Sequence, residues 1–256
     1  MLKAEEQIRS YYHELYDAWG RQHWWPAASR FEVIVGAYLT QNTSWTNVER
    51  ALANLRKARR LNISGIRNAP LSELEQLIHS AGYFRQKAQR LKTFVAFLDR
   101  QYSGSLTQMF SQPTPKLREE LLALNGVGPE TADSILLYAG NHPVFVVDAY
   151  TRRILERHRI VTSKTTYEEI RVLFERALSG AARASGRRLR AHEVLTVARK
   201  PKGSSHPPSR MSTAARTGLV QIFNEMHGLI VGVGKNYCLK SQIRCEQCPL
   251  QKFLPG

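Results

Sequence analysis

The chain has 256 residues, enough to bury a sizeable core in one large domain or two small ones. Its 37 Lys and Arg residues against 21 Asp and Glu give a net charge of +16, which favours a polyanionic partner, although a merely soluble basic protein can show it too. No apolar run has the length of a membrane span and the N-terminus is no signal peptide, so we expect a cytoplasmic protein without a membrane partner.

Apolar residues at helical spacing along most of the chain predict an all-α fold. The predicted helices are Ile8–Trp19, Phe31–Leu39, Trp45–Arg56, Pro70–Ala81, Lys87–Gln101, Leu117–Leu124, Pro129–Tyr138, Ala149–His158, Thr166–Leu178, Ala191–Ala198 and Gly218–Val233.

Two adjacent tryptophans, Trp24 and Trp25, precede Pro26 in the loop after the first helix. One interpretation is a core tryptophan beside a lid. The other is a base-stacking pocket, in which a cationic base would add a cation–π energy of roughly 0.5–2 kcal/mol.

A glycine-rich turn, Asn125-Gly126-Val127-Gly128, separates two predicted helices, and Pro129 begins the second. Such a turn leaves backbone N–H groups at a helix N-terminus, where they suit a phosphate oxygen. The turn alone fits an ordinary helical hairpin equally well.

A second signal follows the turn. The apolar run Val144–Val147 ends at Asp148, which can cap the helix that begins at Ala149. A helix N-terminus favours the ionised form of this carboxylate.

Residues 180–217 are rich in Arg, Lys, Gly, Ser and Pro. We interpret Arg199–Ala215 as a mobile basic loop, either a solvated tether or an additional phosphate contact.

The only three cysteines, Cys238, Cys245 and Cys248, lie close together near the C-terminus. They do not form a secreted disulfide framework, and they indicate a reducing compartment and a metal site.

The hairpin Leu124-x-Gly126-Val127-Gly128 followed by Val146-Val147-Asp148 resembles the helix-hairpin-helix DNA glycosylase superfamily, on its endonuclease III side. The resemblance implies that the hairpin binds a DNA phosphate, with a monovalent cation, and that Asp148 is the catalytic carboxylate. The DNA-contacting residues implied at the hairpin are Asn125, Gly126, Val127, Gly128 and Thr131.

The same resemblance assigns roles outside the hairpin. Gln41, in Thr40-Gln41-Asn42-Thr43, matches the glutamine that enters the gap left by a flipped nucleotide. Tyr83 is the candidate wedge into the duplex, although a buried turn aromatic explains it equally well. Trp45 is a third pocket aromatic or a core residue, and Lys235 points toward the Asp148 pocket or toward solvent or phosphate.

The family carries a [4Fe-4S] cluster on four cysteines, and Cys238, Cys245 and Cys248 match the first three. The fourth position is Leu254, so a cluster with another fourth ligand, a different metal and no metal all stay open. Bifunctional relatives have a lysine where this chain has Glu130, which cannot form an imine.

We therefore expect a monomeric, monofunctional glycosylase that acts on double-stranded DNA with a damaged base. The Trp24-Trp25-Pro26 loop, Thr40–Thr43 and Asp148 resemble the endonuclease III-like 3-methyladenine glycosylases. A bifunctional enzyme for oxidised pyrimidines, a mismatch glycosylase and a noncatalytic DNA-binding module are the alternatives. The expected lobes are 28–137, and 1–27 with 138–256, the latter containing the 180–217 insertion.

Overall fold

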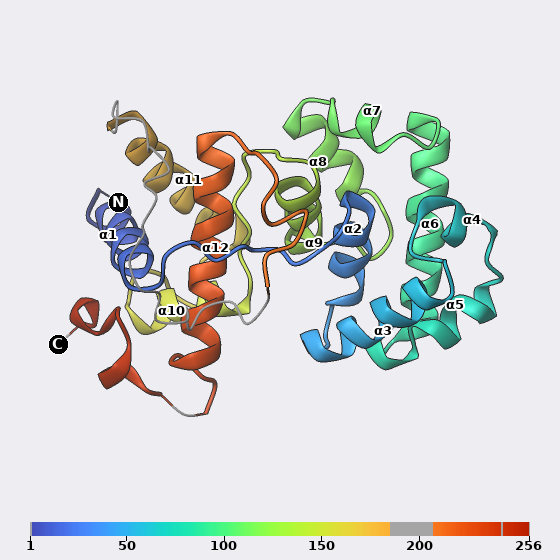
Figure 1. Ribbon diagram of the computed structural model, residues 1–256. Coiled ribbons are helices and arrows are strands. Elements are labelled where there is room, and N and C mark those ends of the chain that lie inside the picture. The colour runs from blue at the N-terminus through green and yellow to red at the C-terminus, as the bar shows by residue number, and fades with distance from the viewer. Residues whose placement is uncertain (1, 185–206, 242, 256) are drawn as a thin grey trace. The chain divides into compact units, whose positions relative to one another are not determined.

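The computed structural model describes residues 2–184, 207–241 and 243–255. The predicted all-α class is confirmed, because every regular element in these residues is helical apart from an isolated bridge between Cys238 and Ile243. Figure 1 shows the arrangement of the helices. No helix among the described residues is both long enough and apolar enough to cross a membrane.

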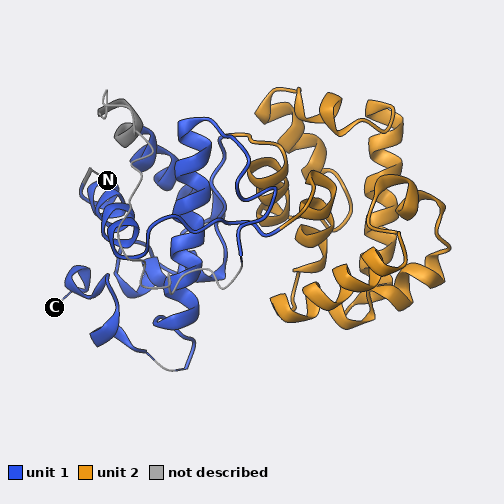
Figure 2. Ribbon diagram, in the orientation of Figure 1, with its two compact units in different colours: residues 1–26, 143–256 blue, residues 27–142 orange. Residues whose placement is uncertain are grey.

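The chain divides into two compact units, shown in Figure 2. Unit 2 is the continuous segment Ala27–His142, and unit 1 combines Met1–Pro26 with Pro143–Gly256. The chain passes from unit 2 back to unit 1 after His142, whereas the expected boundary was 137/138. The residues up to His142 stay with unit 2 because His142 is hydrogen-bonded within it. His142 N donates to Leu136 O at 3.0 Å, and its Nδ1 hydrogen-bonds Thr114 Oγ1 at 2.8 Å.

Unit 2 surrounds the buried helix α2, which contacts α3, α6 and α9. Ser29 begins α2 by accepting a hydrogen bond from Glu32 N at 3.1 Å, as an N-cap residue does. The elements of unit 2 are α2 (Arg30–Leu39), α3 (Trp45–Lys57), α4 (Ile63–Asn68), α5 (Leu71–Leu77), η1 (His79–Ala81), α6 (Phe84–Tyr102), α7 (Leu106–Phe110), α8 (Thr114–Leu122), α9 (Pro129–Ser134) and the π-helical turn η2 (Ile135–Ala139).

Unit 1 is organised around α12, a buried apolar helix that contacts α1, α10 and α11. Phe145 stacks on Phe174 at 4.2 Å and meets Phe223 edge-on at 5.9 Å, so aromatic rings fill the space beside α12. The elements of unit 1 are α1 (Leu2–Trp19), α10 (Ala149–Arg157), α11 (Tyr167–Ala184), α12 (Gly218–Asn236), η3 (Cys245–Gln247) and η4 (Gln251–Phe253).

The predicted helices correspond to the observed ones with shifted ends, apart from the following differences. The segment Pro70–Ala81 is divided into α5 and η1, and the segment Pro129–Tyr138 is divided into α9 and η2. The sequence did not predict α4 and α7, which are too short for apolar periodicity to show. The predicted helix Ala191–Ala198 lies outside the described residues.

The predicted mobile loop Arg199–Ala215 lies partly outside the described residues, and its described end contains a turn. Met211 and Ser212 are buried, and Arg216 Nη2 donates to Met211 O at 2.6 Å. Ser209 Oγ also donates to Trp25 O at 3.4 Å. These contacts fix a turn, because its backbone groups find partners within unit 1.

Candidate active site

The predicted hairpin lies in unit 2, between α8 and α9. Gly126 has a φ of +78°, and a β-carbon there would lie 1.9 Å from Arg90 Nε, so this position requires glycine. Val127 is buried, whereas Gly128 is exposed and a β-carbon on it would meet nothing within 4 Å. Asn125 is exposed as well. One glycine therefore shapes the turn, and the other leaves open space in front of the N-terminus of α9.

Gln41 is hydrogen-bonded to this hairpin. Its Nε2 donates to Gly126 O and to Thr131 Oγ1, both at 2.9 Å, and its Oε1 accepts from Arg90 Nη1 at 2.7 Å. Thr131 is buried, so its hydroxyl serves this network in the structure. Entry of Gln41 into a duplex stays a prediction, and it would require these three bonds to break.

Arg90 is a site residue that sequence reasoning missed. It lies on α6 and contacts a hairpin far along the chain, and no local motif marks such a contact. The close approach of its side chain to Gly126 is possible only because that residue has no β-carbon.

Tyr83 is 66% exposed, so the interpretation as a buried turn aromatic is wrong. Its φ of +46° is in the left-handed region, which is costly for a bulky residue. Nearby, the buried Lys87 donates to Leu39 O at 2.9 Å and to Ala81 O at 2.8 Å. Lys87 therefore ties the end of α2, just before Gln41, to the turn that presents Tyr83.

Asp148 lies in unit 1, at the N-terminus of α10. The predicted cap is confirmed, because its Oδ1 accepts from Thr151 N at 2.7 Å and from Thr151 Oγ1 at 2.9 Å. Its Oδ2 lies 3.5 Å from His227 Nε2. Burial alone would raise the pKa of this carboxyl group, but the neighbouring His227 and the hydrogen bonds from Thr151 outweigh burial and lower it. The carboxylate is therefore ionised at neutral pH.

The tryptophan loop packs on α12. Both Trp24 and Trp25 are buried, with ring centroids 5.7 Å apart, which differs from the expectation that only one would enter the core. Trp24 also meets the His227 ring edge-on at 6.0 Å, and Lys235 Nζ lies 5.8 Å from the Trp24 ring centroid. The structure thus brings the tryptophan loop, Lys235 and Asp148 to one helix.

Glu225 and Gly228 explain this close packing. The buried Glu225 accepts from Gln22 N at 2.6 Å and from Gln221 Nε2 at 2.6 Å, which anchors the chain just before Trp24. A β-carbon at Gly228 would lie 3.0 Å from Gln22 Cβ and 3.1 Å from Trp24 Cβ, so the glycine lets the loop lie close against α12. Sequence reasoning missed both residues, because an isolated Glu or Gly in an apolar helix carries no specific signal.

Three buried side chains beside this region have polar atoms without a hydrogen-bond partner among the described residues. They are Gln22, at Oε1, Trp24, at Nε1, and Asn224, at both atoms of its amide. Buried polar groups are normally paired, so such groups suit a polar ligand or water. The third predicted pocket tryptophan, Trp45, is half-buried at the start of α3 and belongs to unit 2.

The cysteine segment is held to α10 by arginines. Arg157 Nη1 donates to Cys238 Sγ at 3.0 Å, and Arg153 Nε donates to Cys238 O at 2.7 Å. Within the described ranges no group of three His, Cys, Asp or Glu side chains gathers as metal ligands. A cubane takes four ligands, and Leu254 holds the fourth position, so the residues present do not fit a four-thiolate cluster. A cluster with a different fourth ligand stays a prediction, as does a monovalent cation at the hairpin.

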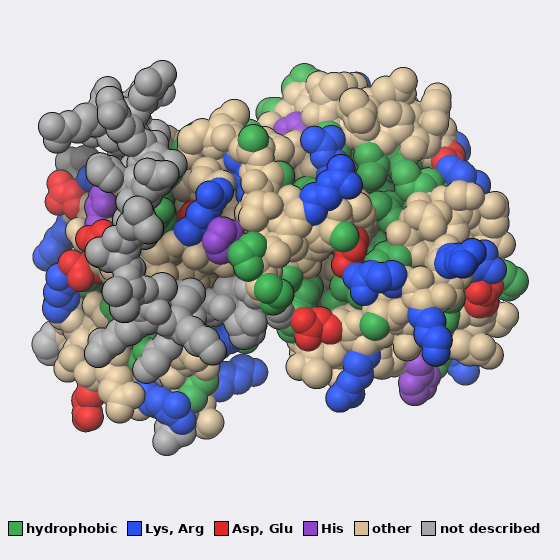
Figure 3. All heavy atoms as spheres, viewed as in Figure 1, with side chains coloured by type: hydrophobic (Ala, Val, Ile, Leu, Met, Phe, Trp, Pro, Cys, Tyr) green, Lys and Arg blue, Asp and Glu red, His purple; other side chains and the backbone are tan. Residues whose placement is uncertain are grey.

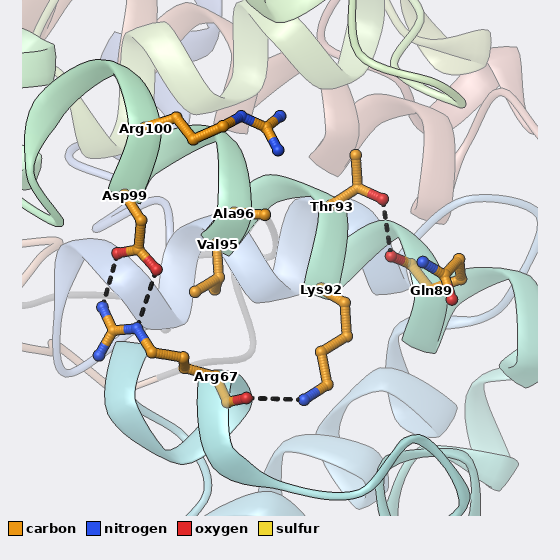
Figure 4. A pocket seen from close by; sticks show the side chains of 8 residues that line it. All are labelled: Arg67, Gln89, Lys92, Thr93, Val95, Ala96, Asp99 and Arg100. Carbon is orange, nitrogen blue, oxygen red and sulfur yellow. Dashed lines mark hydrogen bonds and ion pairs between the residues drawn. The ribbon is translucent and has the colours of Figure 1, made fainter.

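A hollow of about 330 Å³ on unit 2 is unrelated to these groups. Figure 4 shows two interactions beside it: Arg67 pairs with Asp99 at 2.6 Å, and Lys92 donates to Arg67 O at 2.8 Å. The ion pair and this hydrogen bond join α4 to α6. Elsewhere, Lys and Arg side chains are spread over the face shown in Figure 3, in keeping with the positive net charge.

A helix-hairpin-helix followed by a helix-capping aspartate, in an all-α chain, defines a helix-hairpin-helix DNA glycosylase. The family described as HhH-GPD superfamily base excision DNA repair protein matches residues 35–179, more than half of the chain, so the protein belongs to this superfamily. It is endonuclease III-like and a base excision DNA repair glycosylase.

Particular relatives agree with this assignment. The chain is 40% identical over 250 residues to the candidate DNA repair glycosylase MJ1434 of Methanocaldococcus jannaschii, with 97% of this chain and 96% of that protein covered. The solved Helicobacter pylori 3-methyladenine DNA glycosylase MagIII, bound to 1,N6-ethenoadenine, is similar with a TM-score of 0.69 and 27% identity, over 91% of this chain and 97% of that one. A trapped endonuclease III–DNA covalent intermediate shares the fold, with a TM-score of 0.69 and 20% identity over 98% of this chain and 95% of that one.

Proposed function

We propose that this protein is a monofunctional glycosylase that hydrolyses the N-glycosidic bond of an extruded alkylated purine of the 3-methyladenine type. The observation that carries the proposal is that Asp148 and Trp24 both lie against His227 of α12. An ionised carboxylate beside flat aromatic side chains supplies what this reaction needs: a charge for the sugar and a surface for the base.

The carboxylate acts through one oxygen. Thr151 holds Oδ1 as part of the helix cap, so Oδ2 is the oxygen that would orient a water molecule and stabilise the developing positive charge on the sugar. Because the pKa of Asp148 is lowered, the carboxylate needs no activation at neutral pH.

The choice of an alkylated purine follows from the tryptophan loop. A cationic alkylated base is already a good leaving group and needs aromatic contact more than a general acid. Lys235 near the Trp24 ring makes the type of cation–π contact that such a base would make. The 27% identity to a 3-methyladenine glycosylase over 97% of that chain supports the same class.

DNA binding is assigned to unit 2. The hairpin residues Asn125–Gly128 would receive a phosphate, and the exposed Tyr83 would wedge into the duplex. The net charge of +16 supports double-stranded DNA as the partner, with an affinity that falls as the salt concentration rises.

The substrate class is tested by release of free base from DNA treated with a methylating agent, with the products separated by chromatography. We expect 3-methyladenine to be released. Equal activity on undamaged DNA, or release only from DNA that carries oxidised pyrimidines or mismatches, would contradict the proposed substrate.

A bifunctional lyase is the second candidate, because the chain is 31% identical over 166 residues to endonuclease III of Thermotoga maritima, which covers 62% of this chain and 74% of that protein. Two residues argue against it. Glu130 has no amine, and Lys87, whose pKa is lowered to about 8 by burial and by Arg90, is buried and bonded to two carbonyls.

The lyase is tested by borohydride trapping on DNA with an abasic site. We expect no covalent adduct with the wild-type protein. An adduct would show that another lysine attacks the sugar, and mapping the modified peptide would identify it.

A further inference from the structure

His227 is a buried polar side chain that lies against a carboxylate, a tryptophan ring and a phenylalanine ring. Its Nε2 lies 3.5 Å from Asp148 Oδ2. Its ring meets Trp24 edge-on at 6.0 Å and 66°, and Phe145 edge-on at 6.2 Å and 79°. The imidazole therefore touches the carboxylate with one edge and the tryptophan loop with another.

This arrangement differs from that of a histidine that only fills a core. Two aromatic rings pack against the imidazole at steep angles, and its Nε2 lies 3.5 Å from Oδ2. Oδ1 of Asp148 already has two donors from Thr151, so His227 faces the oxygen that the cap leaves for chemistry.

We propose that His227 is a positioning residue. Contact with its Nε2 holds Asp148 Oδ2 in position, and the same imidazole couples that position to the packing of Trp24. A base that packs well against the tryptophan loop would hold the imidazole, and through it the carboxylate, in the productive arrangement. A base that displaced Trp24 would misplace both. Through His227, the fit of the base would affect the rate of bond cleavage as well as the affinity of binding. The inference rests on the role proposed for Asp148.

Few other ionisable groups surround the pair within unit 1. Tyr150 on α10 and the Tyr167 hydroxyl on α11, which accepts from Val147 N at 3.3 Å, lie on the Asp148 side. On α12, Glu225 is engaged with Gln22 and Arg21, and Lys235 lies against Trp24. Among the described groups of unit 1, His227 is the basic side chain whose nitrogen lies within 4 Å of Oδ2.

The test compares two variants, His227→Phe and His227→Gln, in single-turnover base release across a range of pH. Phenylalanine keeps an aromatic ring and removes both ring nitrogens, and glutamine keeps an N–H donor and removes the imidazole. We expect His227→Phe to slow release on the order of 10²-fold, since a small misplacement of a catalytic group has that effect. His227→Gln should recover part of the rate.

The pH profile separates positioning from simple packing. Release needs the ionised carboxylate, so the rate falls as the pH drops through the pKa of Asp148. His227 helps to lower that pKa, so both variants should lose activity at a higher pH than the wild type. DNA affinity should not change.

His158→Phe is the matched control. His158 is also in unit 1 and hydrogen-bonds Tyr11 at 2.7 Å, so the same substitution there tests stability without touching Asp148. The rate and the pH profile should stay as in the wild type.

The outcomes distinguish this inference from the proposed function. If Asp148→Asn still releases base, the role of Asp148 fails. If Asp148→Asn is inactive while His227→Gln keeps the wild-type rate and acid limb, the role of His227 is overturned and that of Asp148 stands. If His227→Phe does not fold, the role of His227 is tested by the acidic side of the pH–rate profile of His227→Gln.

Discussion

Asp148→Asn should abolish base release and leave the protein folded and able to bind DNA. Asparagine caps a helix about as well as aspartate does, and its Oδ1 can still accept from Thr151. What it lacks is the negative charge at the Oδ2 position. We expect a rate loss of at least about 10²–10³-fold, the usual effect of removing a preorganised transition-state interaction. Single-turnover release, melting temperature and DNA affinity would be measured together.

Asp148→Ala is the control for the cap. Alanine removes both the charge and the acceptor for Thr151, so this variant should be equally inactive and also less stable by about 1 kcal/mol. If Asp148→Asn released base at a rate near that of the wild type, the carboxylate would not be the catalytic group. Loss of activity together with loss of folding in Asp148→Asn would mean that the aspartate has only a structural role.

The two hairpin glycines should respond differently to alanine. At Gly126 an alanine must adopt a positive φ, which costs about 1–2 kcal/mol. It must also push Arg90 away from Gln41 and break a hydrogen bond to a charged group, worth about 1.5–3 kcal/mol. Gly126→Ala should therefore lower the melting temperature by about 5–10 °C.

Gly128→Ala is the matched variant, because the added methyl group meets nothing within 4 Å and the φ of −92° suits any residue. Its melting temperature should stay within about 2 °C of the wild type. Its affinity for duplex DNA should nevertheless fall, because the methyl group occupies the space in which a phosphate would approach the backbone. Unchanged affinity in Gly128→Ala would remove the hairpin from the DNA interface.

Local signals made the core of the site predictable. The hairpin needed only a glycine that tolerates positive φ, a buried valine and a proline, and all of these are adjacent in the sequence. Asp148 was predicted as a cap because it follows an apolar run and precedes a helix, and the cap is present. Such signals involve neighbouring residues, so one sequence suffices to read them.

The partners of these residues could not be predicted in the same way. His227 reaches Asp148, and Arg90 reaches the hairpin, through contacts between helices far apart in the chain. The burial of both tryptophans depends on Gly228 and on Glu225, which look unremarkable within an apolar helix. Helix α4 was missed because its signal is confined to the cap of Asn62 on Gly65 N at 2.7 Å.

The division of unit 1 into two chain segments has a consequence for synthesis on the ribosome. Residues 27–142 emerge as one continuous piece, whereas the first 26 residues must wait for α12, near the other end of the chain, before Trp24 has a surface to pack on. A ribosome that stopped before Gly218 would release a chain with the hairpin and Asp148 but without His227. The contact between His227 and Asp148 can therefore form only after α12 has been synthesised.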